Sequence, residues 1–158
     1  MTKAEHSKFL KEAINLAQEG MNIGGGPFGA VVVKDGKIIG RGNNKVTSTH
    51  DPTAHAEVMA IRNACQTLGD FQLTDAVIYT SCEPCPMCLG AIYWSRLEKI
   101  YYACTRQDAA DYGFDDEFIY KEINIDPSKR SIPAIPLPKS EAITIFENWK
   151  QNENKTPY

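Results

Sequence analysis

Residues 76–88, AVIYTSCEPCPMC, join an apolar segment directly to a run that contains three of the chain's five cysteines. The AVIYT part predicts a fully buried strand, and CLGAIYWS, which starts at residue 88, predicts a helix. A strand that turns at once into a helix is a unit from which layered α/β proteins are built. The closely spaced thiols leave three alternatives, which are an iron–sulfur cluster, a redox pair and part of a zinc site.

The rest of the chain alternates between helical and extended patterns. The patterns predict a helix, a hairpin, a second helix, two buried strands and a last helix, at 4–20, around Asp35-Gly36, at 54–68, at 76–80 and 99–104, and from Ser140 onwards. Residues 131–138 contain three prolines and predict an edge strand or an extended linker. This order predicts a three-layer α/β/α sandwich around a mixed sheet of about five strands. We expect residues 1–158 to form a single domain.

The composition is that of an ordinary globular protein, with 42% apolar and 23% charged residues. No apolar run reaches the length of a membrane span and no signal peptide is present, so we expect a cytoplasmic protein without a membrane partner. The net charge of −3 and the lack of a basic cluster argue against a nucleic-acid partner. In the reducing cytosol, closely spaced thiols more often serve metal or redox chemistry than disulfides.

Two short motifs place four polar side chains at predicted helix starts. In DPTAHAEV, residues 51–58, His55 and Glu57 fall in the first turn of a helix. Side chains two residues apart on a helix diverge by about 200°, so this pair suits two adjacent tasks rather than a shared metal. Cys85 and Cys88 open the next helix, share one of its faces, and lie where the helix dipole favours thiolates. His55, Cys85 and Cys88 are therefore candidate metal ligands, and Glu57 is a candidate proton shuttle.

Three protein ligands leave a fourth coordination position open, which is typical of a catalytic zinc. Such a zinc ion makes a water acidic enough to be hydroxide near neutral pH. A closed structural zinc would need a fourth ligand, for which His50 and Cys82 are the local candidates. Cys82 precedes Pro84 at the strand end, so we expect it beside the metal site rather than in it. Cys104 falls on a predicted buried strand, where cysteine acts as a small hydrophobe.

The H-A-E of residues 55–57, followed by P-C-P-M-C at 84–88, resembles the H-x-E…P-C-x-x-C signature of zinc nucleobase deaminases. The predicted order of helices and strands is similar to that of the cytidine/deoxycytidylate deaminase-like superfamily. Four stretches look like the small bacterial guanine deaminases over most of the chain: GGPFGAVVVKDG, DPTAHAEV, IYTSCEPCPMCLGAIYW and GFDDEFIYKEI. The tRNA adenosine deaminases share the zinc motif, but they usually carry a basic C-terminal portion, whereas this chain ends NENKTPY.

The resemblance implies a zinc-dependent aminohydrolase, with one Zn²⁺ per subunit, that converts guanine to xanthine and ammonia in purine metabolism. The activated water would attack C2, and Glu57 would carry protons to a ring nitrogen and then to the departing amine. The alternatives are a deaminase of the same fold that acts on guanosine, cytosine, an aminotriazine or tRNA adenosine, and a non-catalytic zinc module. Glu57 argues against the zinc module, because a purely structural site has no use for a proton shuttle.

Several side chains are candidates for contact with the base. Phe28 follows a Gly-Pro break and lines either a pocket or the core, and Trp94 has the same two interpretations. The amide of Asn44 can both donate and accept at a base edge, and the resemblance favours that role over a simple turn asparagine. Asp115 and Asp116 can each accept from the N1–H and the amine of guanine, and the resemblance favours Asp116.

The C-terminal segment suggests a contribution from a second subunit. Tyr158, the last residue, offers an aromatic ring together with a carboxylate, and the resemblance supports a C-terminal tyrosine at the active site. The proline-rich segment before Ser140 would act as a stiff hinge, and short hinges favour domain swapping. The hypothesis is a homodimer in which residues 139–158 are exchanged between subunits.

Overall fold

A computed structural model describes residues 2–158, which divide into two units, one ending at Glu117 and the other beginning at Phe118. The two units are described separately. The elements of the first unit are α1 (Lys3–Asn22), β1 (Gly29–Lys34), β2 (Lys37–Asn43), α2 (Val46–Thr49), α3 (Ala56–Leu68), β3 (Ala76–Cys82), α4 (Pro86–Trp94), β4 (Lys99–Cys104) and α5 (Arg106–Asp111). They are followed by α6 (Glu117–Ile123), the short 3₁₀ helix η1 (Pro127–Lys129) and α7 (Ser140–Gln151).

The sheet of the first unit has four strands in the order β2-β1-β3-β4. The predicted hairpin is confirmed: β1 and β2 are antiparallel, and the turn residues Asp35 and Gly36 have φ of 50° and 71°, which suits a two-residue hairpin turn. Strand β1 also pairs with β3 in the antiparallel sense, and β3 pairs with β4 in parallel through the crossover helix α4. The mixed sheet is therefore as expected.

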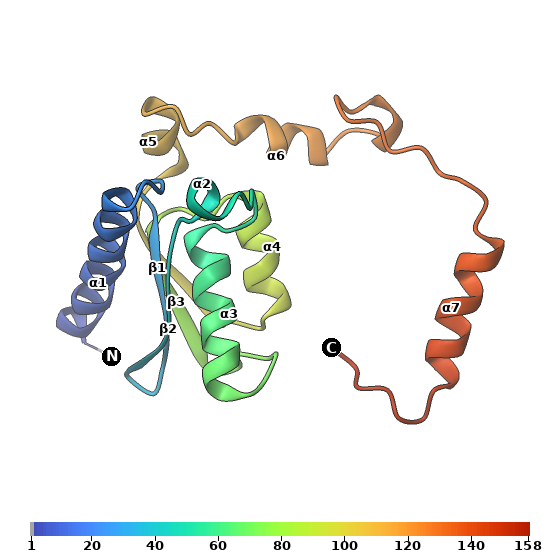
Figure 1. The fold of residues 1–158 in the computed structure, drawn as a ribbon, viewed down its shortest axis with the longest axis horizontal. Coiled ribbons are helices and arrows are strands. Elements are labelled where there is room, and N and C mark those ends of the chain that lie inside the picture. Colours follow the sequence, from blue (N-terminus) through green and yellow to red (C-terminus); the bar gives the residue numbers. More distant parts are fainter. Residues whose placement is uncertain (1) are drawn as a thin grey trace. The chain divides into compact units, whose positions relative to one another are not determined.

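Helices cover both faces of this sheet, so the predicted three-layer arrangement is confirmed (Figure 1). On one face, Phe9 and Ala13 of α1 pack against Tyr79 and the odd-numbered valines of β1. On the other face, α3 and α4 pack against the even-numbered residues of β1 and β3, among them Ile78. Both apolar clusters lie next to the central strands, and this packing holds the first residues of α3 and α4 above the same end of the sheet.

Helix α3 approaches β2 closely because two strand residues have no side chain. A Cβ atom added at Gly42 would lie far inside contact distance of the Ala56 carbonyl oxygen, and one at Gly40 would meet the Ala60 carbonyl oxygen in the same way. Backbone-to-strand contact at these two glycines therefore sets the height of α3 over the sheet, and Ala56 is the first residue of that helix.

Two sequence expectations about the sheet are wrong. The sheet has four strands rather than about five, because residues 131–138 form no strand, in keeping with prolines that cannot donate to a ladder. Strand β4 was expected to be buried, but it is the edge strand, and four of its six residues are exposed, Cys104 among them. Apolar character alone does not reveal whether a neighbouring element covers a strand.

The second unit is extended chain with η1 and α7, and it exposes many apolar side chains. The exposed fractions are 85% for Ile132, 75% for Ile135, 82% for Leu137 and 70% for Phe146. Its last helix runs from Ser140 to Gln151 as expected, although Lys139 rather than Ser140 occupies the N-cap position. Among residues 2–158, none of the helices combines the length and the apolar character needed to cross a bilayer.

We expect the change Gly42→Ala to lower the free energy of unfolding by about 3 kcal/mol, because the added methyl group must push α3 off the strand. The matched control is Gly90→Ala in α4, where an added Cβ meets nothing within 4 Å. Alanine is the better helix former, so this variant should be equal to or about 1 kcal/mol more stable than the wild type. Urea unfolding of both variants measures the difference, and equal midpoints would contradict the close approach.

Candidate metal centre and substrate cavity

The three candidate ligands lie at the N-termini of α3 and α4. His55 is the N-cap of α3, with φ −72° and ψ 154°, and Cys85 is the N-cap of α4, with φ −65° and ψ 169°. Cys88 lies three residues after Cys85, and Pro86 occupies the first helical position, where a missing N–H costs nothing. The extended backbone of an N-cap turns its side chain over the helix end, so both helix termini direct ligands to one place.

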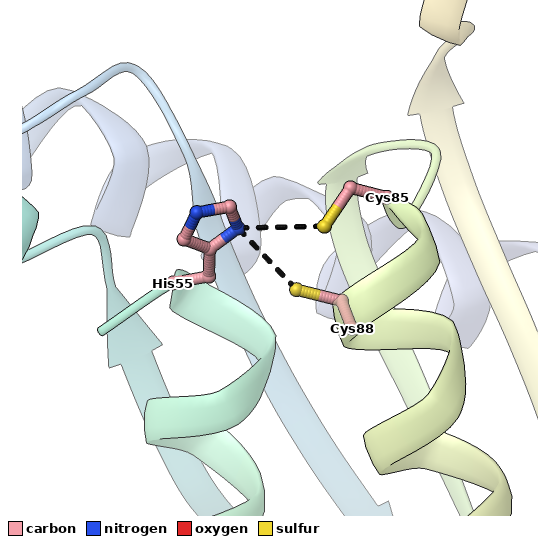
Figure 2. Close-up of side chains that lie close together, drawn as sticks. All are labelled: His55, Cys85 and Cys88. Atoms are coloured by element: carbon pink, nitrogen blue, oxygen red, sulfur yellow. Dashed lines mark hydrogen bonds between the residues drawn. The ribbon is translucent and has the colours of Figure 1, made fainter. Parts of the chain in front are cut away.

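Figure 2 shows the His55 imidazole pointing between the two sulfurs. Its Nδ1 lies 3.6 Å from Cys85 Sγ and 3.5 Å from Cys88 Sγ, and the three ligand atoms all lie within 4.8 Å of one another. A tetrahedral zinc with ordinary bond lengths separates a ligating nitrogen from a ligating sulfur by about 3.6 Å. These spacings and the two-sulfur, one-nitrogen donor set fit a zinc ion.

The two thiols differ sharply in acidity. The hydrogen bond from Cys88, helped by His55, lowers the pKa of Cys85 to about 4. The same hydrogen bond, followed by burial and the nearby carboxylate of Glu57, raises the pKa of Cys88. The hydrogen bond to Cys85 also raises the pKa of His55. Cys85 is thus the sulfur that is ionised without a metal, and binding a cation must displace the proton from Cys88, since the thiolate is the form that ligates.

Glu57 is buried beside this group, at the second position of α3. Its Oε2 accepts from Cys88 Sγ at 3.3 Å, and its Oε1 accepts from Thr80 Oγ1 at 3.3 Å. Burial raises the pKa of the carboxyl. A carboxyl group that is close to the ligands, without being one of them, can take up and return protons there.

A cavity of about 400 Å³ opens above these residues, which is within the usual size for a small-molecule site. His55, Glu57 and Cys85 form part of its wall. The other lining residues used below are Phe28, Asn44, Cys82, Glu83, Arg106, Phe114, Asp115 and Asp116.

Two of the predicted base contacts line the cavity from the β1–β2 side. Asn44 is 7% exposed, and its Oδ1 accepts from the backbone N–H groups of Gly26 and Val46, at 3.2 Å each. Since the oxygen is occupied, the amide can offer the cavity its N–H donors. Phe28 is half-buried and meets Phe114 edge-to-face, with ring centroids 4.9 Å apart. The two rings form an apolar wall.

The structure separates the neighbouring carboxylates Asp115 and Asp116, although both line the cavity. Asp115 Oδ1 accepts from the backbone N–H of Glu117 at 2.9 Å, which fits the start of α6. Asp116 is half-buried, and burial followed by the charge of Cys85 raises its pKa. Asp116 is therefore the carboxylate whose environment is coupled to the metal group.

Other candidates fall outside the metal group. Cys82 is buried and lines the cavity, and burial raises its pKa to about 11, while its Sγ donates to the Thr105 carbonyl at 3.5 Å. Among the described residues, the possible metal ligands comprise His55, Cys85 and Cys88 without Cys82 or His50. Trp94, 64% exposed at the end of α4, does not fill the core as one interpretation expected, and it lies outside the described cavity lining. Tyr158 belongs to the second unit and is 73% exposed.

Four cavity residues were missed from the sequence, namely Thr80, Glu83, Arg106 and Phe114. Glu83 and Arg106 belong to different elements and meet because the Arg106 backbone N–H donates to Glu83 Oε2 at 3.1 Å. Thr80 shares a strand face with Ile78, which in hindsight is the signal that directs it toward α3.

Comparison with known proteins gives a consistent result. Residues 3–104 match the family model of the cytidine and deoxycytidylate deaminase zinc-binding region. The guanine deaminase of Bacillus subtilis (strain 168) is 56% identical over 154 residues, which are 97% of this chain and 99% of that protein. An X-ray structure of guanine deaminase from Bacillus subtilis matches with a TM-score of 0.94 and 55% identity, covering 100% of this chain and 99% of that one.

A second group of relatives matches over a shorter stretch. A tRNA-specific adenosine deaminase of Buchnera aphidicola subsp. Baizongia pistaciae (strain Bp) is 41% identical over 104 residues, which are 66% of this chain and 64% of that protein.

We expect Cys88→Ala to abolish tight zinc binding, because removing one of three ligands leaves two for the ion. Cys82→Ala is the matched control, since Cys82 is also a buried thiol near the cavity but lies outside the metal group. Metal analysis after dialysis should give about one zinc per chain for the wild type and the control, and little for Cys88→Ala. Loss of zinc from Cys82→Ala would mean that Cys82 is a fourth ligand and the site is closed.

Proposed function

The chain belongs to the cytidine and deoxycytidylate deaminase zinc-binding family, and from this premise we propose that it hydrolyses guanine to xanthine and ammonia. The reaction consumes one water and releases the exocyclic amine at C2. One observation carries the proposal. A buried carboxylate, Glu57, lies against a metal-binding trio in the wall of a cavity of the size of a free base. The relative that matches nearly the whole chain is a guanine deaminase.

His55, Cys85 and Cys88 would hold the zinc ion, as their spacing and donor chemistry fit it. When bound through three protein ligands, zinc supplies a Lewis acid that makes a water nucleophilic near neutral pH. The two helix N-termini add their positive ends to the site, which favours the anionic thiolates and a developing negative charge on the substrate.

Glu57 would move the protons of the reaction. Its carboxylate takes a proton from the attacking water, passes it to a ring nitrogen beside C2, and then protonates the departing amine. Burial raises the pKa of this carboxyl, which brings it closer to neutral pH and suits a group that must both accept and donate. A group with an ordinary carboxyl pKa would return the proton less readily.

The cavity offers complementary groups to the two edges of guanine. The N–H donors of Asn44 suit an acceptor such as the carbonyl oxygen or a ring nitrogen of the purine, because the amide oxygen already binds two backbone groups. The carboxylate of Asp116 suits the N1–H and amine donors. The apolar faces of Phe28 and Phe114 suit the flat ring. The same arrangement would bind guanosine or another aminated ring less completely.

The tRNA-editing alternative is supported by the adenosine deaminase relative but not by the charge of the cavity. Glu83, Asp115 and Asp116 contribute three carboxyl groups to its lining, against one guanidinium from Arg106. The phosphates of a polynucleotide would lie beside these carboxylates, and the chain carries a net charge of −3. A free base carries no phosphate and avoids this repulsion.

We also propose that the enzyme is a homodimer that exchanges residues 139–158, with Tyr158 reaching the site of the other subunit. The exposed apolar side chains of the second unit support this, since monomers rarely leave so many uncovered. The five free thiols support a location in the reducing cytosol.

The function is tested by ammonia release from guanine, guanosine, adenine, cytosine, cytidine and ammeline, with the zinc-loaded wild type and Glu57→Gln in parallel. We expect guanine to be the preferred substrate of the wild type. Glu57→Gln should keep its zinc but lose about 100-fold or more of the turnover, because the amide cannot carry the proton.

Two results would overturn this account. Equal turnover of guanine by Glu57→Gln would remove Glu57 from the mechanism. Turnover of cytidine or adenosine in tRNA, with guanine inert, would replace the proposed substrate while leaving the zinc chemistry in place.

For the dimer, we expect a chain that ends at Leu137 to be monomeric in sedimentation equilibrium, because it lacks the exchanged segment. Full-length Tyr158→Ala is the matched control, which should remain dimeric but bind guanine more weakly. A truncated chain that still dimerises with unchanged affinity would rule out the exchange.

A further inference from the structure

A buried hydroxyl group connects the central sheet to the carboxylate of Glu57. Thr80 lies near the end of β3, is 1% exposed, and directs its Oγ1 to Glu57 Oε1 at 3.3 Å. It shares the strand face of Ile78, which packs in the core against α3. The strand backbone on either side is held by pairing with β1 and β4, where Thr80 pairs with Ala30 and with Tyr102. The hydroxyl therefore has a rigid support.

The direction of this hydrogen bond follows from chemistry. An ionised carboxylate has no proton and can only accept, so the threonine hydroxyl is the donor. A buried carboxylate that loses a donor is penalised, because hydrogen bonds to charged groups are among the stronger ones in proteins. Thr80 and Glu57 are thus matched in burial and in polarity.

The two oxygens of Glu57 have different partners. Oε2 accepts from the Cys88 thiol at 3.3 Å, whereas Oε1 accepts from Thr80. Cys88 can donate only while it keeps its proton, and a metal-ligating cysteine is a thiolate. With the site loaded, the contact of Oε2 with Cys88 is no longer a donated hydrogen bond, while that of Oε1 with Thr80 persists.

We propose that Thr80 is a positioning residue that fixes Oε1 of Glu57, so that Oε2, on the side of the metal ligands, is the oxygen that carries the proton. This inference rests on the proposed role of Glu57 as proton shuttle. While the Thr80 hydroxyl points its hydrogen at Oε1, a second hydrogen on that oxygen would clash with it. The arriving proton is directed to Oε2 in each cycle, and the carboxylate does not have to reorient between accepting and donating.

A purely structural role for Thr80 makes a different prediction. If the hydroxyl only stabilised the core, its loss would lower stability and weaken substrate or metal binding together with turnover. If it orients the carboxylate, its loss lowers kcat at nearly constant KM, because the interaction matters most while the proton moves.

The test uses the zinc-loaded full chain and four variants. Thr80→Val replaces the hydroxyl by a methyl group and keeps the branched shape that suits a strand, and Thr80→Ser restores a hydroxyl. Ser95→Ala removes another buried hydroxyl, which donates to the Ile92 carbonyl away from the carboxylate. The double variant Thr80→Val with Glu57→Gln shows whether Thr80 acts through Glu57. Readouts are kcat and KM for guanine, zinc per chain, and the orientation of the Glu57 carboxylate in crystals.

We expect Thr80→Val to lower kcat by about tenfold to a hundredfold, from the strength of a hydrogen bond to a charged group, with KM changed by less than about twofold. Thr80→Ser should recover most of the rate, Ser95→Ala should match the wild type, and the double variant should be no slower than Glu57→Gln. The carboxylate should be rotated in Thr80→Val and native in Thr80→Ser.

The inference is overturned if Thr80→Val keeps its kcat, if it loses zinc or raises KM in proportion to the rate loss, or if the carboxylate does not move. Should Thr80→Val fail to fold, the pair Thr80→Ala and Thr80→Ser isolates the hydroxyl on a smaller side chain. Should the wild type act on another base, the same series is run on that base. A wild type inert on every base refutes the proposed function alone, and the crystal orientation then decides the role of Thr80.

Discussion

The meeting of two helix N-termini over one end of the sheet is the constraint on which the site depends. His55 caps α3 and Cys85 caps α4, and their extended backbones turn the ligating atoms toward each other. The resulting separations of 3.5 and 3.6 Å are those of a tetrahedral zinc site. Neither helix could supply the trio alone, so the metal centre exists only when both helices are docked.

Packing at a distance from the metal secures that docking. Gly42 allows the first turn of α3 to rest on β2, and the parallel pairing of β3 with β4 places α4 as a crossover on the same face of the sheet. Strand β3 ends at Cys82, three residues before Cys85, and also carries Thr80 under the Glu57 carboxylate. One central strand therefore leads to a ligand and supports the proton shuttle.

The local parts of this arrangement could be predicted from the sequence, whereas the long-range parts could not. Cys85 and Cys88 are predictable because their spacing on one helix brings the sulfurs together, and His55 because its motif begins a helix. The contacts of Thr80, Arg106 and Phe114 depend on the order β2-β1-β3-β4, which no local pattern encodes. The exposure of Cys104 has the same origin, since a strand's hydropathy does not say whether another element covers its face. Asp115 and Asp116 were indistinguishable until the hydrogen bond from Glu117 was seen.

X-ray absorption at the zinc edge of the loaded wild type tests the central claim most directly, because it counts the ligands of the ion. The account predicts two sulfurs at about 2.3 Å, one imidazole nitrogen at about 2.0 Å, and one further light atom from solvent or substrate. That light-atom shell should change when guanine is added to Glu57→Gln. Three sulfurs, or four protein ligands that guanine does not disturb, would show a closed site and contradict the account.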